Sequence, residues 1–213
     1  MTLRAPFPPP SRPTAPLTGM LDRLCQNWVY GGALAGVLIL SLAPLLLADW
    51  SWPMIAVFLQ LPVYMLHQYE EHDDGRFGRF INDMLGDGRT VLSTAAIFVI
   101  NVPGVWGVNA VSIWLAASLG VGFGLVGIYL TLVNAVVHIV PALRLRRFNP
   151  GLVTAIVLFL PVGIWALFEV AGAPGVTGIH HLIGLGFAVL IHLGIVAYVF
   201  NNRRHAFREL SRP

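Results

Sequence analysis

Lysine is absent from this sequence of 213 residues, and charged residues of all kinds make up only 11% of it. Soluble domains average about 25% charged residues, so this composition excludes a water-soluble globular protein. The single cysteine, Cys25, excludes an intrachain disulfide. The sequence also has no P-loop, no G-x-S-x-G nucleophile elbow and no C-x-x-C pair, which excludes the commoner soluble chemistries.

Hydrophobic residues make up 56% of the chain and form six runs long enough to cross a membrane, which takes about 20 apolar residues. The runs are Trp28–Ala48, Trp52–His72, Arg89–Ser118, Leu119–Leu143, Gly151–Ala171 and Thr177–Phe200. The sequence therefore predicts an all-α polytopic membrane protein with six transmembrane helices. We expect the third helix to be kinked at Pro103, because proline removes a backbone hydrogen bond.

The thirteen arginines all fall on one side of this six-helix arrangement. They lie before the first run, between the second and third, between the fourth and fifth, and after the sixth. Basic residues mark the cytoplasmic side, so we expect both termini in the cytoplasm. The arginines are grouped in short connecting segments, a distribution that predicts no nucleic-acid binding.

The ends of the chain are predicted to lie outside the membrane. Residues 1–20 hold six of the fifteen prolines, a composition typical of a disordered tail. Residues 21–205 would then form the transmembrane domain, and residues 206–213 a short cytoplasmic tail.

Histidines on three separate helices are predicted to lie at one depth in the membrane. His67, His138 and His192 each precede the cytoplasmic end of their run by six to nine residues, or roughly 9–14 Å. Glu70 and Glu71 follow His67 at spacings that place carboxylates over the same helix face. We therefore predict a metal site formed by His67, Glu71, His138 and His192, holding a divalent transition metal such as zinc or iron.

The remaining polar residues of this region are predicted to support the site. Glu70 and Asn134 join Glu71 as candidate catalytic groups: Glu70 would shuttle protons or pair with an arginine of the 76–79 segment, and Asn134 would orient His138 or a water molecule. His72, with the acidic residues after it, is expected to form a solvated helix end.

A second polar group is predicted at the opposite, outer end of the helices. It consists of Glu169, His180 and His181. It would form a proton-linked pair, an access site or a polar helix start, and the sequence leaves these alternatives open.

Two motifs carry a resemblance to a known family. The sequence His67-Gln-Tyr-Glu70-Glu71 resembles the signature of the HXXEE-domain family of bacterial membrane proteins, and Asn134-Ala-Val-Val-His138 is similar to that family's N-x-x-x-H motif. The family's third motif, H-x-x-x-H, has no counterpart, and His180-His181 with His192 stands in its place. The resemblance implies a location in a bacterial inner membrane. It also implies an enzyme active site that includes the five residues of the first two motifs, with no assigned reaction.

Three functions agree with this pattern. A metal-dependent membrane enzyme would act on a lipid or another hydrophobic substrate near the cytoplasmic leaflet, by hydrolysis or oxidation. A proton-coupled transporter would use the glutamate pair for protonation, and the similar placing of Glu70 and Glu169 after Leu-Pro-Val would suit an inverted repeat. A haem protein would use the histidines as axial ligands. The enzyme is the leading hypothesis.

Overall fold

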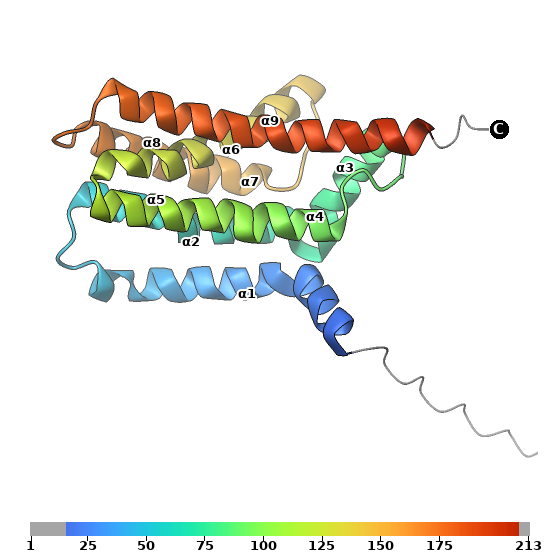
Figure 1. The fold of residues 1–213 in the computed structure, drawn as a ribbon, viewed down its shortest axis with the longest axis horizontal. Helices are drawn as coiled ribbons and strands as arrows, with labels where there is room; N and C mark the ends of the chain where they lie inside the picture. Colours follow the sequence, from blue (N-terminus) through green and yellow to red (C-terminus); the bar gives the residue numbers. More distant parts are fainter. Residues whose placement is uncertain (1–15, 209–213) are drawn as a thin grey trace, which may run out of the picture.

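The computed structural model describes residues 16–208, which are helical along most of their length (Figure 1). Among these residues there is no β-strand, which confirms the predicted all-α fold for this part of the chain. The elements in chain order are α1 (Pro16–Leu46), α2 (Trp52–His72), η1 (Asp73–Gly75), α3 (Arg76–Gly86), α4 (Thr94–Val99), η2 (Ile100–Trp106), α5 (Gly107–Ser118), η3 (Val121–Gly124), α6 (Leu125–Leu145), α7 (Leu152–Thr154), η4 (Ala155–Phe159), α8 (Leu160–Ala171) and α9 (Gly178–Arg208).

Five helical stretches are long and apolar enough to cross a membrane, as in a polytopic membrane protein. They are Gly19–Leu46, Thr94–Ser118, Val121–Leu145, Leu152–Ala171 and Gly178–Arg208. Helix α2 has the bounds predicted for the second span, Trp52–His72, but is not one of the five. Its last two turns carry the polar side chains of the predicted site, which lower its mean hydropathy.

Several boundaries differ from the prediction. Helix α1 begins at Pro16, inside the predicted tail, because proline is well suited to the first turn of a helix. At the other end, α9 continues to Arg208, beyond the predicted limits at Phe200 and residue 205. Residues 1–15 and 209–213, and with them most of the predicted tails, lie outside the described residues.

The connection after α2 is itself partly helical. Helix α3 crosses the end of the bundle where α1 starts and α9 finishes (Figure 1). It ends at left-handed backbone conformations, with φ of 50° at Asp87 and 79° at Gly88. The next helix begins at Thr94 and not at Arg89, because the hydroxyl of Ser93 caps it by accepting from the backbone N–H of Ala96 at 3.2 Å.

The helical stretch Thr94–Ser118 passes Pro103 through a π-helical segment, η2. Helical structure continues from Thr94 to Ser118 across this segment, where a kink was predicted. A π-helical turn accommodates the missing proline N–H without ending the helix. A second π-helical segment, η4, precedes Pro161 in the stretch Leu152–Ala171.

Helix α2 lies inside the bundle and packs against α1, α5, α6 and α8. Glycines allow the close approaches, as is common between membrane helices. A Cβ atom at Gly124 would lie only 2.1 Å from Cγ2 of Val57 in α2, and one at Gly184 in α9 would lie 2.8 Å from the backbone oxygen of Leu125. This central position surrounds the polar end of α2 with other helices.

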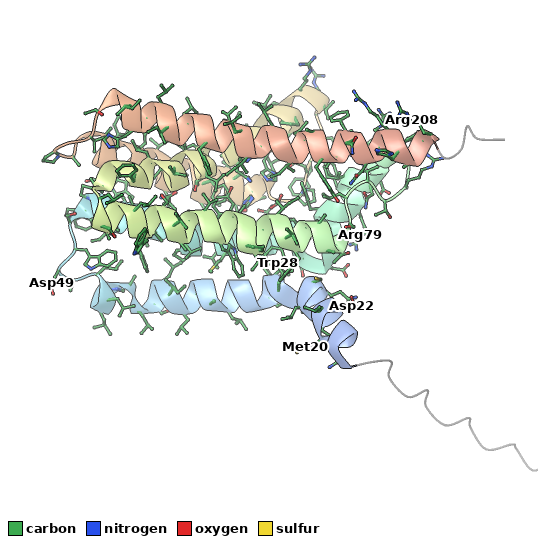
Figure 2. The ribbon with its side chains drawn as sticks, in the orientation of Figure 1. Met20, Asp22, Trp28, Asp49, Arg79 and Arg208 are labelled. Carbon is green, nitrogen blue, oxygen red and sulfur yellow. The ribbon has the colours of Figure 1, made fainter. Side chains whose placement is uncertain are left out.

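Both ends of the described chain lie at the same end of the bundle (Figure 1). Arg79 and Arg208 also lie there, whereas Asp49 lies at the opposite end (Figure 2). Two arginines near this end have partners. Arg79 forms an ion pair with Asp74 at 2.9 Å, and the guanidinium of Arg89 lies 4.5 Å from the ring centre of Phe207 in α9. We call this the arginine-rich end.

Candidate metal centre

Two histidines and one glutamate converge at the buried end of α2. His67 and Glu71 lie one turn apart on α2, and His138 reaches them from α6. One ligand atom from each residue lies within 4.8 Å of the other two, and the residues are 0%, 6% and 3% exposed. Nε2 of His67 and Nε2 of His138 lie 3.6 and 3.5 Å from the carboxylate oxygens of Glu71. Among residues 16–208 this is the one group of three or more such side chains able to hold a metal ion.

Thr154 fixes the orientation of His67 through Nδ1, the ring nitrogen that does not face Glu71. Nδ1 of His67 lies 2.8 Å from the Thr154 hydroxyl, which also lies 2.5 Å from Oε2 of Glu70. An ionised carboxylate only accepts hydrogen bonds, so the hydroxyl donates to Glu70 and accepts from Nδ1–H of His67. The lone pair of His67 is therefore on Nε2, which is buried, faces Glu71 and has no hydrogen-bond partner.

Glu70 is anchored by the backbone at the start of the helical stretch Leu152–Ala171. Its carboxylate accepts from the N–H groups of Val153 at 3.1 Å and Thr154 at 2.6 Å. These N–H groups belong to the first turn of the stretch, where backbone donors lack partners within the helix and favour an anion. The predicted pairing of Glu70 with Arg76 or Arg79 is wrong, because these arginines pair with Asp73 and Asp74.

His138 is held by a second polar residue, Asn149. Nδ1 of His138 lies 2.8 Å from Oδ1 of Asn149, and Nδ2 of Asn149 donates to the backbone oxygen of His138 at 2.9 Å. Since an amide oxygen only accepts, Nδ1 of His138 carries a proton, and in the neutral ring Nε2 carries the lone pair. The prediction that Asn134 orients His138 is wrong, because Asn149 occupies that role.

Gly151 leaves room for both imidazoles. Its φ is +93°, and a Cβ atom there would lie 2.7 Å from Cε1 of His138 and 3.0 Å from Cε1 of His67. The segment that contains Asn149, Gly151 and Thr154 therefore supplies the surroundings of both rings. Sequence reasoning missed all three residues; the Asn-Pro-Gly turn was the one available signal of a tight connection.

His72 is buried beside the same carboxylate. It is 6% exposed, Nε2 lies 3.1 Å from Oε2 of Glu71, and neither ring nitrogen makes a hydrogen bond. Its ring packs against Trp28 of α1 and Phe77 of α3, with centroid separations of 5.4 and 5.3 Å. The expectation of a solvated end applies to Asp74, whose side chain is 84% exposed, and is wrong for His72.

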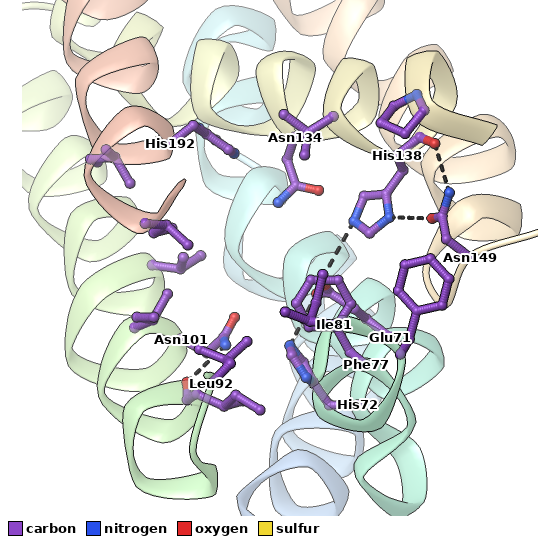
Figure 3. A pocket seen from close by; sticks show the side chains of 18 of the residues that line it. Glu71, His72, Phe77, Ile81, Leu92, Asn101, Asn134, His138, Asn149 and His192 are labelled. Atoms are coloured by element: carbon purple, nitrogen blue, oxygen red, sulfur yellow. Dashed lines mark hydrogen bonds and ion pairs between the residues drawn. The ribbon is translucent and has the colours of Figure 1, made fainter. Parts of the chain in front are cut away.

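A cavity of about 200 Å³ opens beside Glu71 and His138. Helices α3, α6 and α9 supply mostly apolar side chains to its wall, while its polar lining includes Asn134 and His192 (Figure 3). Oδ1 of Asn134 is buried and has no hydrogen-bond partner. Glu71, Asn134 and His138 therefore face whatever the cavity contains, whereas His67 does not line it.

A second pocket lies on the other side of His72. It has a volume of about 220 Å³ and is lined by polar and apolar residues of α1, α3 and α4, among them Cys25, Arg79 and Asn82. His72 lines both this pocket and the cavity beside Glu71. Leu92 and Ile97 also line both spaces, so these three side chains lie between them.

Residues 58–166 match the family described as a protein of unknown function with an HXXEE motif, a match that spans half of the chain. The chain belongs to this family. The resemblance of the motif is thus confirmed, and in this HXXEE protein the motif is the buried end of α2. No curated protein and no solved structure gives a significant match to the chain.

His192 of this HXXEE protein stands apart from the three converging groups. Its Nδ1 donates to the backbone oxygen of Ala188 at 2.8 Å, and its ring lines the cavity on the far side of Asn134 from His138 in the view of Figure 3. The group that can hold a metal contains His67, Glu71 and His138 without it. Its predicted place as a ligand is wrong, although it does lie on the wall of the same cavity.

The predicted outer group does not converge. His180 accepts from the backbone N–H of Thr177 at 3.1 Å at the start of α9, and Nδ1 of His181 lies 2.9 Å from the hydroxyl of Tyr129. Glu169 forms no metal-holding group with these histidines among the described residues. Of the three alternatives, the geometry favours the polar helix start.

Proposed function

We propose that this HXXEE protein is a metal-dependent enzyme of the bacterial inner membrane that acts on a lipid or another hydrophobic substrate near the cytoplasmic leaflet. The observation that carries the proposal is the convergence of His67, His138 and Glu71 beside an apolar cavity. Buried polar atoms normally have partners. Nε2 of His67 has none, and a metal ion would provide one.

The surroundings of the histidines support metal binding over simple packing. Histidines that bind metals nearly always donate their other ring N–H to a carboxylate, a carbonyl or a similar group. Both histidines do so here, to Thr154 and to Asn149. Each Nε2 lone pair is thus directed toward the same carboxylate.

The ligand set suits a catalytic ion. Two histidines and one carboxylate leave at least one coordination position open, as in catalytic zinc sites and in non-haem iron oxygenases. An ion held there would acidify a bound water molecule or polarise a carbonyl group, and iron would also bind oxygen. Zinc would therefore indicate hydrolysis, and iron would indicate oxidation.

Other residues would take supporting roles. Oδ1 of Asn134 would accept a hydrogen bond from a water molecule or from the substrate in the cavity. Glu70 would act as a positioning residue, because its hydrogen bonds run to the backbone and to Thr154.

We also propose that α2 is the sixth transmembrane helix and that both termini are cytoplasmic. Helix α2 packs among the five apolar stretches, and its partners replace lipid around its polar end. The arginine-rich end would face the cytoplasm.

The alternative hypothesis, a proton-coupled transporter, would use both glutamates as a protonation site. Glu71 lines the cavity, whereas Glu70 is engaged by backbone N–H groups and by Thr154. This separation favours the enzyme. The third hypothesis, a haem protein, stays an untested prediction.

Metal analysis of the purified protein tests the proposal. We expect the wild-type protein in detergent to retain zinc or iron, and His138→Ala and Glu71→Gln to lose it. His192→Ala is the matched control, since His192 lines the cavity but lies outside the converging group, and it should retain the ion. Equal metal contents in the wild type and in His138→Ala would contradict the proposal and favour the transporter.

A further inference from the structure

An apolar groove runs between α4 and α9 near the arginine-rich end. Its volume is about 590 Å³, within the range of about 300–1,000 Å³ that is typical of ligand sites. Apart from Ser93 and Tyr198 its lining is apolar or glycine, and it includes Ala96, Val99, Ile191 and Gly194. Both helices belong to stretches able to cross a membrane, so the groove faces hydrocarbon in the bilayer.

The groove adjoins the cavity of the proposed metal centre. Ile100 from η2 and Ile191 and Ile195 from α9 line both spaces. The cavity then reaches Glu71 and His138. The side chains of these three isoleucines thus lie between the groove and the cavity that holds Glu71 and His138.

The groove is open because its two walls pack against different helices. Helix α9 packs mainly against α6, while α4 packs against α1. Small residues widen the space between the walls: a Cβ atom at Gly194 would meet nothing within 4 Å. Val99, on the opposite wall, is 58% exposed.

We infer that this groove admits one acyl chain of a membrane lipid and brings the attached polar group to the cavity. An acyl chain matches the apolar lining, and acyl chains are the main component of the hydrocarbon core of a bilayer. The polar group would meet the unpartnered Oδ1 of Asn134 and the converging groups in the cavity. The assignment of this lipid as the substrate rests on the proposed function, but occupation of the groove does not require a metal.

Photolabelling tests the inference. The probe is palmitic acid with a diazirine in its chain, added to the full-length protein in phosphatidylglycerol vesicles. We expect labelling to concentrate on residues 93–100 and 191–198. Gly194→Phe should lower it several-fold by filling the groove. Gly186→Phe is the matched control: it alters another glycine of α9 with open space around it, outside the groove, and should leave labelling unchanged.

Labelling spread evenly over the lipid-facing helices, and insensitive to Gly194→Phe, would overturn the inference. Cross-linking of two protein copies through residues 191–198 would also overturn it, since a second copy would then cover the groove. Metal analysis of the same samples separates the two proposals. Groove-specific labelling of a protein without metal would refute the enzyme and leave the lipid site standing, whereas a metal-bound protein with even labelling would refute only the lipid site.

Discussion

Asn149 holds His138 at two points, with Oδ1 2.8 Å from Nδ1 of the ring and Nδ2 2.9 Å from the residue's backbone oxygen. The first contact fixes which ring nitrogen carries the proton, and the second ties the amide to α6 itself. Protein groups alone therefore hold the imidazole in one orientation. Orientation of this kind is what neighbours of metal ligands provide.

Loss of this amide should weaken metal binding without changing the ligands. We expect Asn149→Ala to bind the ion roughly 10–100-fold more weakly, the usual effect of removing such a neighbour. Competition with a chelator measures the affinity. Asn109→Ala controls for the loss of a buried asparagine, since Asn109 is 1% exposed and its amide donates to Val105. Equal affinities for the two variants would contradict the role of Asn149.

Glu70 and Thr154 should act as one unit. Glu70→Gln and Thr154→Val each disturb the path of hydrogen bonds that ends at Nδ1 of His67. We expect each to retain the ion but to bind it about 10–100-fold more weakly. The double variant should be little weaker than either single one, because residues in one network are not additive.

A matched pair checks this coupling. Thr154→Val combined with Asn149→Ala should give additive losses in the free energy of metal binding, because these residues support different histidines. Additive losses for Glu70→Gln with Thr154→Val would mean that Glu70 acts independently of His67.

Substitution of Gly151 should affect stability and metal binding together. Gly151→Ala adds a Cβ atom against both imidazoles and places alanine at a φ of +93°, a conformation that costs about 1–3 kcal/mol outside glycine. Gly175→Ala is the control, since Gly175 has a φ of +81° and nothing within 4 Å of a Cβ atom. We expect both variants to lower the unfolding temperature and only Gly151→Ala to lower metal content. Loss of metal in Gly175→Ala as well would point to general destabilisation.

Cysteine labelling should establish the orientation in the membrane. In a Cys25→Ser background, single cysteines between residues 76 and 89 or between 144 and 147 should react with an impermeant thiol reagent only from the cytoplasm. Cysteines at residues 49–52 or 172–176 should react only from outside. Reaction of the 144–147 segment from outside would contradict six crossings.

The sequence was most informative where a single helix determined the geometry. Hydrophobic runs gave the long helices to within a few residues at most boundaries, and the i,i+4 spacing of His67 and Glu71 correctly placed both on one face. His192 was misplaced because depth along a helix does not determine how far apart two helices lie. It faces the same cavity as Glu71 and His138, but α9 carries it on the far side of Asn134.

The partners of the ligands were harder to predict. Asn149 and Gly151 lie in a connection whose path depends on tertiary packing and follows no periodic pattern, and Thr154 lies in the first turn of the helix that follows. Glu70 binds backbone N–H groups, which occur at the start of any helix and have no residue type to mark them. A pairing with arginine was the better guess from sequence alone, but nearer aspartates occupy those arginines.

The imidazole of His72 lies, with Leu92 and Ile97, between the second pocket and the cavity at Glu71. The attraction between a carboxylate and a cation falls as the local dielectric constant rises, by several-fold between a dry interior and water. A low dielectric constant around Glu71 therefore depends in part on the ring of His72 and on its packing against Trp28 and Phe77. A shift of α3, which carries Phe77, would expose the ring of His72. It would weaken the binding of an ion without displacing any ligand.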